Sequence, residues 1–239
     1  MQLIILASGK GSRLKNKTAK KPKCLVEVNK KPIIDYMSNL INSYKTIIVT
    51  GFKSHLLEKK FGKEKIFYNK DFSTTNMVHS LFSVNKKIKK DLIVVYSDII
   101  FNSKIITDLK KINSTIIPVK RNWLKIWKLR MSTKKILDDA EDLKIRNKRI
   151  IAIGDKISPN NFPKYQFMGI IKIKLKDYRK MFKVYRKLKN KKIDFTNFLN
   201  ILIKRYKFNI FAKPTSNFWL EIDNNADLKV AKFLLNENK

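Results

Sequence analysis

Hydrophobic residues in the first hundred positions form short apolar runs that alternate with amphipathic segments. The runs are rich in isoleucine and valine and predict buried strands at residues 3–7, 46–50, 66–68 and 92–97. The segments between them repeat apolar residues at helical spacing and predict helices at residues 32–42, 54–61 and 76–88. Strands that alternate with helices indicate a mainly parallel sheet with right-handed crossovers, so the pattern predicts the α/β fold class.

The second half of the chain has a more mixed pattern. It predicts strands at residues 114–119, 143–145, 150–153, 169–173 and 219–222, and helices at residues 177–188, 196–206 and 226–235. No repeat and no flexible linker divides the sequence. We therefore expect residues 1–239 to form one domain, in which residues 118–170, approximately, form an inserted lobe that faces the substrate.

A loop with two glycines leaves the first predicted strand, in the stretch Leu6-Ala7-Ser8-Gly9-Lys10-Gly11-Ser12-Arg13-Leu14. Gly9 and Gly11 allow the backbone to approach a ligand because neither carries a Cβ. Exposed N–H groups in such a loop can cradle phosphates, and Arg13 and Lys23 add positive charge. The spacing matches neither the dinucleotide-binding fingerprint nor the P-loop, so a tight turn is the alternative interpretation. We favour a nucleoside triphosphate site.

Two aspartates directly follow predicted strands: Asp98 follows residues 92–97, and Asp223 follows residues 219–222. Open α/β sheets bind ligands at the carboxyl ends of their strands, although an aspartate there also commonly forms a turn or a helix cap. Two carboxylates at one crevice suit Mg²⁺, so both aspartates are candidate metal ligands. Glu221 is expected on the opposite face of its strand and is the weaker candidate.

The motif L-A-S-G-K-G-S-R-L, followed by P-K-C-L at residues 22–25, resembles the signature of nucleotidyltransferases that join a phosphorylated metabolite to a nucleotide. Ser8 stands where that family usually has alanine, which is another small residue. The resemblance implies a Rossmann-like, mainly parallel mixed sheet flanked by helices, of the nucleotide-diphospho-sugar transferase type. It implies that Asp98 and Asp223 hold the metal. It also implies a set of nucleotide-binding residues: Leu6, Ala7, Ser8, Gly9, Gly11, Ser12, Arg13, Lys23 and Asn76.

Further segments resemble the small-metabolite cytidylyltransferases that act on phosphocholine, 2-aminoethylphosphonate or phosphoglutamine. They are Thr75-Asn76-Met77-Val78-His79-Ser80-Leu81, residues 123–130, residues 138–141 and Gln166-Phe167-Met168-Gly169. The resemblance implies that the acceptor contacts a second set of residues: Ser80, Trp127, Arg130, Asp138 and Glu141. The alternatives are a helix N-cap for Asn76, core packing for Trp127 and surface solvation for the two acids.

These features predict a CTP-dependent cytidylyltransferase that joins CMP to a small phosphorylated or phosphono amine or amide and releases pyrophosphate. Mg²⁺ is the expected cofactor, Lys23 would neutralise charge on the α-phosphate, and Arg13 would hold the leaving phosphates. The acceptor oxygen would attack the α-phosphorus in line, so no side-chain nucleophile is needed. A sugar-1-phosphate nucleotidyltransferase is the first alternative, because it shares the glycine loop and the metal aspartates.

The net charge of +35 raises an alternative from another class, a basic nucleic-acid-binding protein. The excess consists of 46 lysines and 8 arginines, which are scattered along the whole chain. Lysine, isoleucine and asparagine are abundant together, which favours coding bias from an AT-rich genome over specific nucleic-acid binding. The charge should still attract polyanions and steer an anionic substrate.

Composition limits the remaining classes of protein. Cys24 is the single cysteine and the chain has two histidines, so neither an internal disulfide nor a zinc site is expected. We expect Cys24 to be a packed residue rather than a reactive thiol. No apolar run reaches the length of a membrane span and no signal peptide precedes the first strand, so we expect a cytoplasmic protein. The sequence does not determine the oligomeric state, and a homodimer is one arrangement that it allows.

Overall fold

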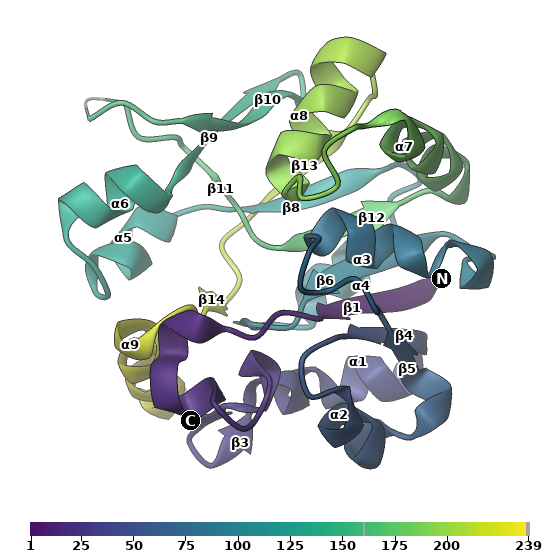
Figure 1. The fold of residues 1–239 in the computed structure, drawn as a ribbon. Coiled ribbons are helices and arrows are strands. Elements are labelled where there is room, and N and C mark those ends of the chain that lie inside the picture. Colours follow the sequence, from purple (N-terminus) through teal and green to yellow (C-terminus); the bar gives the residue numbers. More distant parts are fainter. Residues whose placement is uncertain (160, 238–239) are drawn as a thin grey trace.

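In a computed structural model, which describes residues 1–159 and 161–237, helices flank a mixed central sheet (Figure 1). Its strands follow the order β5-β4-β1-β6-β12-β8-β13-β10-β9, and β11 pairs with β8. Their bounds are β1 Gln2–Ala7, β4 Lys45–Thr50, β5 Ile66–Tyr68, β6 Leu92–Tyr96, β8 Ile116–Lys120, β9 Glu141–Arg146, β10 Arg149–Lys156, β11 Gln166–Phe167, β12 Ile170–Ile173 and β13 Phe211–Thr215. Two small sheets lie apart: β2 (Glu27–Val28) with β3 (Lys31–Pro32), and β7 (Ile99–Phe101) with β14 (Trp219–Glu221).

The α-helices are α1 Ser38–Ser43, α2 Ser54–Phe61, α3 Met77–Ser83, α4 Lys104–Lys110, α5 Trp123–Lys128, α6 Thr133–Asp139, α7 Leu175–Lys187, α8 Phe195–Tyr206 and α9 Asn225–Glu237. Across the ranges that the structure describes, none of these helices combines the length and the apolar character that a membrane crossing requires.

One half of the sheet is parallel, as the alternation of strands and helices predicts. Strand β1 pairs in parallel with β4 and β6, and β4 pairs in parallel with β5. Strand β12 runs antiparallel to β6, and β10 runs antiparallel to both β13 and β9. The sheet is therefore mixed. Because Leu6 of β1 pairs with Tyr96 of β6, the glycine loop and the residues after β6 leave the same edge.

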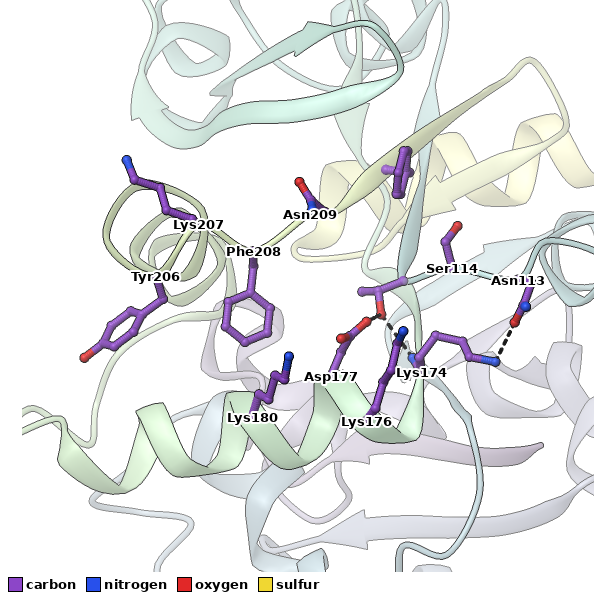
Figure 2. A pocket seen from close by; sticks show the side chains of 12 residues that line it. Asn113, Ser114, Lys174, Lys176, Asp177, Lys180, Tyr206, Lys207, Phe208 and Asn209 are labelled. Atoms are coloured by element: carbon purple, nitrogen blue, oxygen red, sulfur yellow. Dashed lines mark hydrogen bonds between the residues drawn. The ribbon is translucent and has the colours of Figure 1, made fainter.

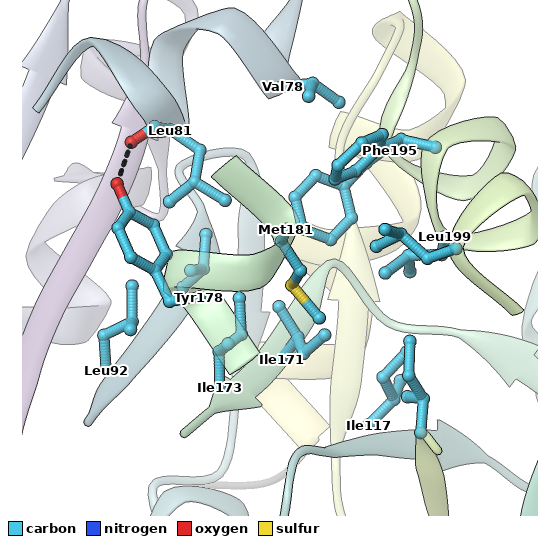
Figure 3. Close-up of a cluster of buried hydrophobic side chains, with 14 of the residues drawn as sticks. Val78, Leu81, Leu92, Ile117, Ile171, Ile173, Tyr178, Met181, Phe195 and Leu199 are labelled. Atoms are coloured by element: carbon cyan, nitrogen blue, oxygen red, sulfur yellow. Dashed lines mark hydrogen bonds between the residues drawn. The ribbon is translucent and has the colours of Figure 1, made fainter. Parts of the chain in front are cut away.

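Apolar side chains cover both faces of the sheet. Ile4 and Leu6 belong to one core cluster, whereas Leu3 and Ile5 belong to another, because successive residues of a strand point to opposite faces. Figure 3 shows the first cluster, in which the Tyr178 hydroxyl donates a hydrogen bond to the Leu81 carbonyl at 3.3 Å. Burial on both faces explains why β1 is a continuous apolar run.

Strands β7 and β14 join two distant parts of the chain. Ile99 pairs with Glu221 in antiparallel register, and the N–H of Ile222 donates to the carbonyl of Asp98 at 3.0 Å. This pairing brings Asp98 and Asp223, which are far apart in sequence, to one place in the fold.

The region of residues 118–170 contains α5, α6 and strands of the central sheet. Trp123 and Trp127 pack with Ile136 and Ala140 in a small separate core, and their rings meet edge to face at 5.0 Å. Strands β9, β10 and β11 of this region belong to the main sheet. Its description as an inserted acceptor-binding lobe stays a prediction.

The predicted elements differ from the observed ones at their ends, and the pattern also missed several elements, including α4, α5, α6 and β7. The predicted helix 32–42 begins as a 3₁₀ helix, Ile33–Met37, before α1, and the predicted helix 76–88 ends at Ser83. The sequence analysis missed β13, whose lysine and proline interrupt any apolar run; parallel pairing with β8 holds it as a strand. Propensity alone did not identify elements that depend on a distant partner.

Candidate active site

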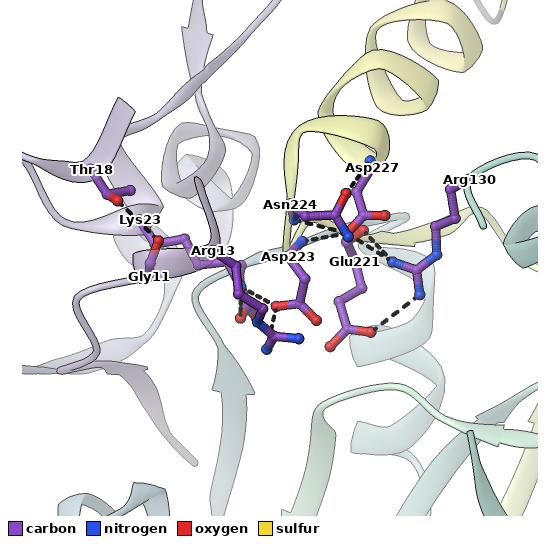
Figure 4. Close-up of polar contacts among 10 residues, drawn as sticks. Gly11, Arg13, Thr18, Lys23, Arg130, Glu221, Asp223, Asn224 and Asp227 are labelled. Atoms are coloured by element: carbon purple, nitrogen blue, oxygen red, sulfur yellow. Dashed lines mark hydrogen bonds and ion pairs between the residues drawn. The ribbon is translucent and has the colours of Figure 1, made fainter. Parts of the chain in front are cut away.

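Lys23, Asp98 and Asp223 converge at the edge of the sheet where the glycine loop leaves it, and Figure 4 labels Lys23 and Asp223 among their neighbours. The Lys23 Nζ donates to Asp98 Oδ2 at 2.8 Å and also contacts Asp223 Oδ1. The Lys23 side chain is only 12% exposed, so this ammonium group is largely removed from water. Two carboxylates therefore face one point from different segments of the chain, which is the arrangement predicted for them.

Electrostatics keeps Lys23 and Asp223 charged, two members of the triad that Lys23, Asp98 and Asp223 form. Burial disfavours the charged form of Lys23, but the two carboxylates outweigh it and raise the pKa of Lys23 above its ordinary value. Burial alone would raise the pKa of Asp223, whereas Lys23 and then Arg13 lower it on balance. The Arg13 Nη2 lies 3.3 Å from Asp223 Oδ1, and the Arg13 side chain is mostly exposed. The predicted catalytic cations are thus neighbours of the predicted metal ligands.

The backbone of the glycine loop is shaped to fit Lys23. Gly11 has φ +72°, a left-handed conformation, and an added Cβ there would lie 2.6 Å from the Lys23 Cβ. The Thr18 hydroxyl donates to the Gly11 carbonyl at 2.9 Å and closes the loop. At Gly9 an added Cβ would meet no protein atom within 4 Å, so the protein itself does not require glycine there.

A cavity of about 150 Å³ lies between the glycine loop and α3. Leu6, Ser8, Gly9 and Asn76 line it, together with Asp98. Ala7 is buried and Ser12 is exposed, so these two predicted nucleotide contacts belong to the loop without lining the cavity. Gly11, Arg13 and Lys23 also lie outside its lining, so four of the nine predicted nucleotide-binding residues gather around this hollow.

Ser80 lines the same cavity, so its predicted contact with the acceptor stays a prediction that this position does not favour. Its hydroxyl donates to the Ser8 hydroxyl at 3.2 Å and accepts a hydrogen bond from Asn69 Nδ2 at 3.0 Å. The side chain is buried, and Ser80 does not line the neighbouring cavity that contains Arg130 and Glu141. One helical turn after Asn76, Ser80 supports the glycine loop instead.

Asn76 caps α3, and its place in the cavity lining leaves its role in nucleotide binding a prediction. Its Oδ1 accepts the N–H of Met77 at 2.8 Å and caps α3, while its Nδ2 donates to the Lys192 carbonyl at 3.3 Å. His79, in the same segment, contacts the Tyr185 hydroxyl at 2.7 Å and Asp71 at 3.3 Å. His79 is absent from the linings of both cavities, which agrees with a packing role.

A second cavity, of about 230 Å³, adjoins the triad, because Arg13 and Asp223 line it. Aromatic side chains and acids form most of its remaining wall: Tyr96, Trp127, Phe167, Phe195, Asp139, Glu141, Asp194 and Glu221. Arg130 and Gln166 lie among them. Acidic and aromatic walls favour an acceptor that carries an amine or an amide.

Three of the predicted acceptor residues line this cavity, namely Trp127, Arg130 and Glu141. The Thr196 hydroxyl donates to Glu141 Oε1 at 2.8 Å, and burial raises the pKa of Glu141. Asp138 is exposed and absent from the lining, whereas the next residue, Asp139, is present. Successive side chains of an α-helix point about 100° apart, so Asp138 and Asp139 of α6 face different directions. The structure therefore favours Asp139 over the predicted Asp138.

Glu221 faces the site, and the expectation that it points away was wrong. It lies two residues from Asp223, so strand alternation puts both side chains on one face (Figure 4). Its Oε2 lies 3.7 Å from Arg130 Nη2. Burial, and then the nearby charges of Asp223 and Asp98, raise the pKa of Glu221.

Sequence reasoning also missed Asp227, whose carboxylate holds the turn after β14. Its Oδ2 accepts the N–H groups of Asp223 at 2.7 Å and Asn224 at 3.0 Å, and Arg130 Nη1 lies 3.1 Å away. Asn224 and Asp227 form a reciprocal helix cap, and the spacing of an asparagine and an acid three residues apart could have indicated it.

Other chemical groups lie outside this site. Cys24 is buried, and burial raises the pKa of its thiol to about 12, as expected for a packed cysteine. A further cavity of about 350 Å³ lies where β8 begins, between α7 and α8 (Figure 2). Lys174, Lys176, Lys180 and Lys207 line it, and none of the predicted site residues is among its lining.

Comparisons with known proteins agree with this geometry. A family model described as Nucleotidyl transferase matches residues 2–121. The CTP:phosphoglutamine cytidylyltransferase of Campylobacter jejuni is 32% identical over 96% of this chain and 98% of its own length. The choline-phosphate cytidylyltransferase of Streptococcus pneumoniae is 31% identical over 51% of this chain and 54% of that protein.

Two solved structures show the same fold. The CTP:phosphocholine cytidylyltransferase from Streptococcus pneumoniae has a TM-score of 0.76 at 20% identity and covers 98% of both chains. The inositol-1-phosphate CTP transferase from T. maritima has a TM-score of 0.76 at 18% identity, covering 96% of this chain and 94% of its own. The likeness supports the Rossmann-like, mainly parallel mixed sheet that the sequence predicts.

Proposed function

This chain belongs to the nucleotidyl transferase family, and on that premise we propose that it is a CTP-dependent cytidylyltransferase. It joins CMP to a small phosphorylated amine or amide and releases pyrophosphate, and the acceptor is of the phosphoglutamine type. The similarity to the phosphoglutamine enzyme, which spans both chains almost completely, supports this acceptor. The convergence of Lys23 with Asp98 and Asp223 carries the assignment to an active enzyme.

The cavity beside the glycine loop receives the nucleotide. Leu6, Ser8 and Gly9 line it, and Asn76 forms the opposite wall. Gly9 leaves open space for a phosphate because its Cβ position meets no protein atom within 4 Å. Lys23 packs against Gly11, and both Lys23 and Arg13 contact Asp223, so two cations lie beside the site that we assign to the triphosphate.

A divalent cation fits the two carboxylates. Asp98 Oδ2 and Asp223 Oδ1 face one point, and Asp98 Oδ1 is buried without a hydrogen-bond partner in the part of the chain that the structure describes. Mg²⁺ is commonly bound by one or two carboxylates together with substrate phosphates, so this pair is the donor set that we assign to it. When bound, the ion supplies charge neutralisation for the triphosphate and the acceptor phosphate.

The residues of the chain then perform the transfer by position and charge. An acceptor phosphate oxygen attacks the α-phosphorus, the bond from the α-phosphorus to the bridging oxygen of the β-phosphate breaks, and pyrophosphate leaves with the electron pair. Lys23, held protonated by its two carboxylates, moves its ammonium charge to the α-phosphate, and Arg13 retains the leaving phosphates. Trp127 and Glu141 bind the amino or amide end of the acceptor.

Pyrophosphate release with Mg²⁺ tests the proposal. Each nucleoside triphosphate is combined with phosphocholine, phosphoethanolamine, 2-aminoethylphosphonate, phosphoglutamine and several sugar 1-phosphates. We expect turnover with CTP and phosphoglutamine, and its loss in Asp98→Asn. Turnover with a sugar phosphate alone would move the protein to the sugar-1-phosphate class. No CTP binding together with salt-sensitive duplex binding would instead favour the nucleic-acid alternative.

A further inference from the structure

The backbone next to Asp223 is held by a carboxylate that does not face the nucleotide. Asp227 Oδ2 accepts the N–H of Asp223 at 2.7 Å and the N–H of Asn224 at 3.0 Å. In return, Asn224 Oδ1 accepts the N–H of Asp227 at 3.2 Å. The Asp227 side chain has 0% exposure. The turn that presents Asp223 therefore depends on a fully buried negative charge.

Arg130 is the cation that neutralises this charge (Figure 4). Its Nη1 lies 3.1 Å from Asp227 Oδ2 and donates to the Glu221 carbonyl at 3.4 Å. Its Nη2 lies 3.7 Å from Glu221 Oε2, and its guanidinium lies 4.4 Å from the centre of the Trp127 ring. One arginine, located just after α5, thus contacts the chain on both sides of Asp223.

These contacts occupy Nη1, one of the donors that a phosphate would need, and burial shields the others. Nη1 already serves two acceptors, and Nε is buried without a hydrogen-bond partner among the described residues. The Arg130 side chain is only 5% exposed. A buried carboxylate that loses its cation is left uncompensated, and the structure around it must then shift.

We propose that Arg130 and Asp227 are positioning residues that hold Asp223 in the orientation needed for the divalent cation, and that Arg130 does not bind the acceptor phosphate. This inference rests on the proposed function, because the proposed function is what makes Asp223 a metal ligand. Residues that orient a metal ligand typically change metal affinity or activity by about 10- to 100-fold when they are replaced.

The test measures Mn²⁺ binding by electron paramagnetic resonance with a non-hydrolysable CTP analogue present, together with kcat and the acceptor KM from pyrophosphate release. The single variants are Arg130→Met, Arg130→Lys and Asp227→Asn. The double variant combines Arg130→Met with Asp227→Asn. Asp227→Asn keeps an oxygen that accepts the two N–H groups but removes the charge. It therefore reports on the ion pair even where Arg130→Met folds poorly.

We expect Arg130→Met and Asp227→Asn each to weaken Mn²⁺ binding and lower kcat by about 10- to 100-fold, with little change in the acceptor KM. The double variant should lose about as much as one single variant, because both remove the same contact. Arg130→Lys should recover part of the Mn²⁺ affinity, since lysine keeps one positive charge near Asp227.

Arg149→Met is the matched control. Arg149 also lies over an aromatic ring, that of Phe211 at 5.6 Å, but it is exposed and remote from the triad, so Mn²⁺ affinity should not change. A large rise in the acceptor KM with unchanged Mn²⁺ affinity would overturn the inference and assign Arg130 to the acceptor. Wild-type protein without CTP-dependent turnover would instead refute the proposed function.

Discussion

At the residue scale, Lys23 is held where two carboxylates from distant segments meet. The two carboxylates remove conformational freedom from the lysine and keep it protonated, so the free protein already carries the charge that the proposed function requires at the α-phosphate. Pre-orientation of this kind is worth more for the transition state than for the bound nucleotide, because charge on the α-phosphate builds during the transfer.

We therefore expect Lys23→Ala to lower kcat by about 100- to 1,000-fold and to weaken CTP binding much less. Single-turnover pyrophosphate release and calorimetric CTP binding measure the two effects separately. Lys21→Ala is the control, because Lys21 forms only a loose surface pair with Glu27 at 3.8 Å. Equal losses in turnover and in binding would show that Lys23 acts as a simple nucleotide anchor.

The sequence allowed Lys23, Arg13, Asp98 and Asp223 to be chosen before the structure was known, since each follows a strand or a glycine loop. It did not indicate that Ser80 contacts Ser8, that Arg130 pairs with Asp227, or that Asp139 rather than Asp138 lines the second cavity. Their contacts depend on which helix face meets which strand, and a motif carries no information on that packing. The error over Glu221 was of a different kind, because alternation itself puts Glu221 and Asp223 on one face.

At the element scale, α3 starts directly at the nucleotide cavity, and Asn76 caps it. The cap links local stability to the site, because the same side chain also donates to the Lys192 carbonyl at 3.3 Å. Helix α3 is short, so the cap satisfies a large share of its unpaired N–H groups.

Asn76→Ala should lower the free energy of unfolding by about 1 kcal/mol, as loss of an N-cap typically does. Asn76→Asp should retain most of that stability, because a carboxylate oxygen still accepts the N–H of Met77, but it loses the donor that contacts Lys192. Urea denaturation of the three proteins measures the difference. If alanine and aspartate destabilise the protein equally, the cap is not the source of the effect.

At the scale of the whole molecule, the net charge of +35 surrounds a site whose substrates are anions. Such a field raises the rate of encounter with CTP and is screened by salt, since the Debye length shortens as ionic strength rises. The lysine-lined cavity in Figure 2 shows that positive charge also gathers away from the site. The field therefore acts on anions without regard to their identity.

We expect kcat/KM for CTP to fall several-fold between about 20 and about 300 mM NaCl, whereas kcat at saturating CTP changes little. Steady-state pyrophosphate release over a salt series measures both constants. A potassium glutamate series controls for specific chloride binding. A salt-independent kcat/KM would mean that the charge has no part in substrate capture.

The sequence by itself determined the α/β alternation, the glycine loop and the identity of the charged residues, because these depend on local spacing and residue type. Only the tertiary structure decided that β14 pairs with β7, that Arg130 binds Asp227, and that Ser80 supports the loop. Such contacts join residues that are far apart along the chain. They form only when the whole sheet and both of its cores are packed, which no local pattern records.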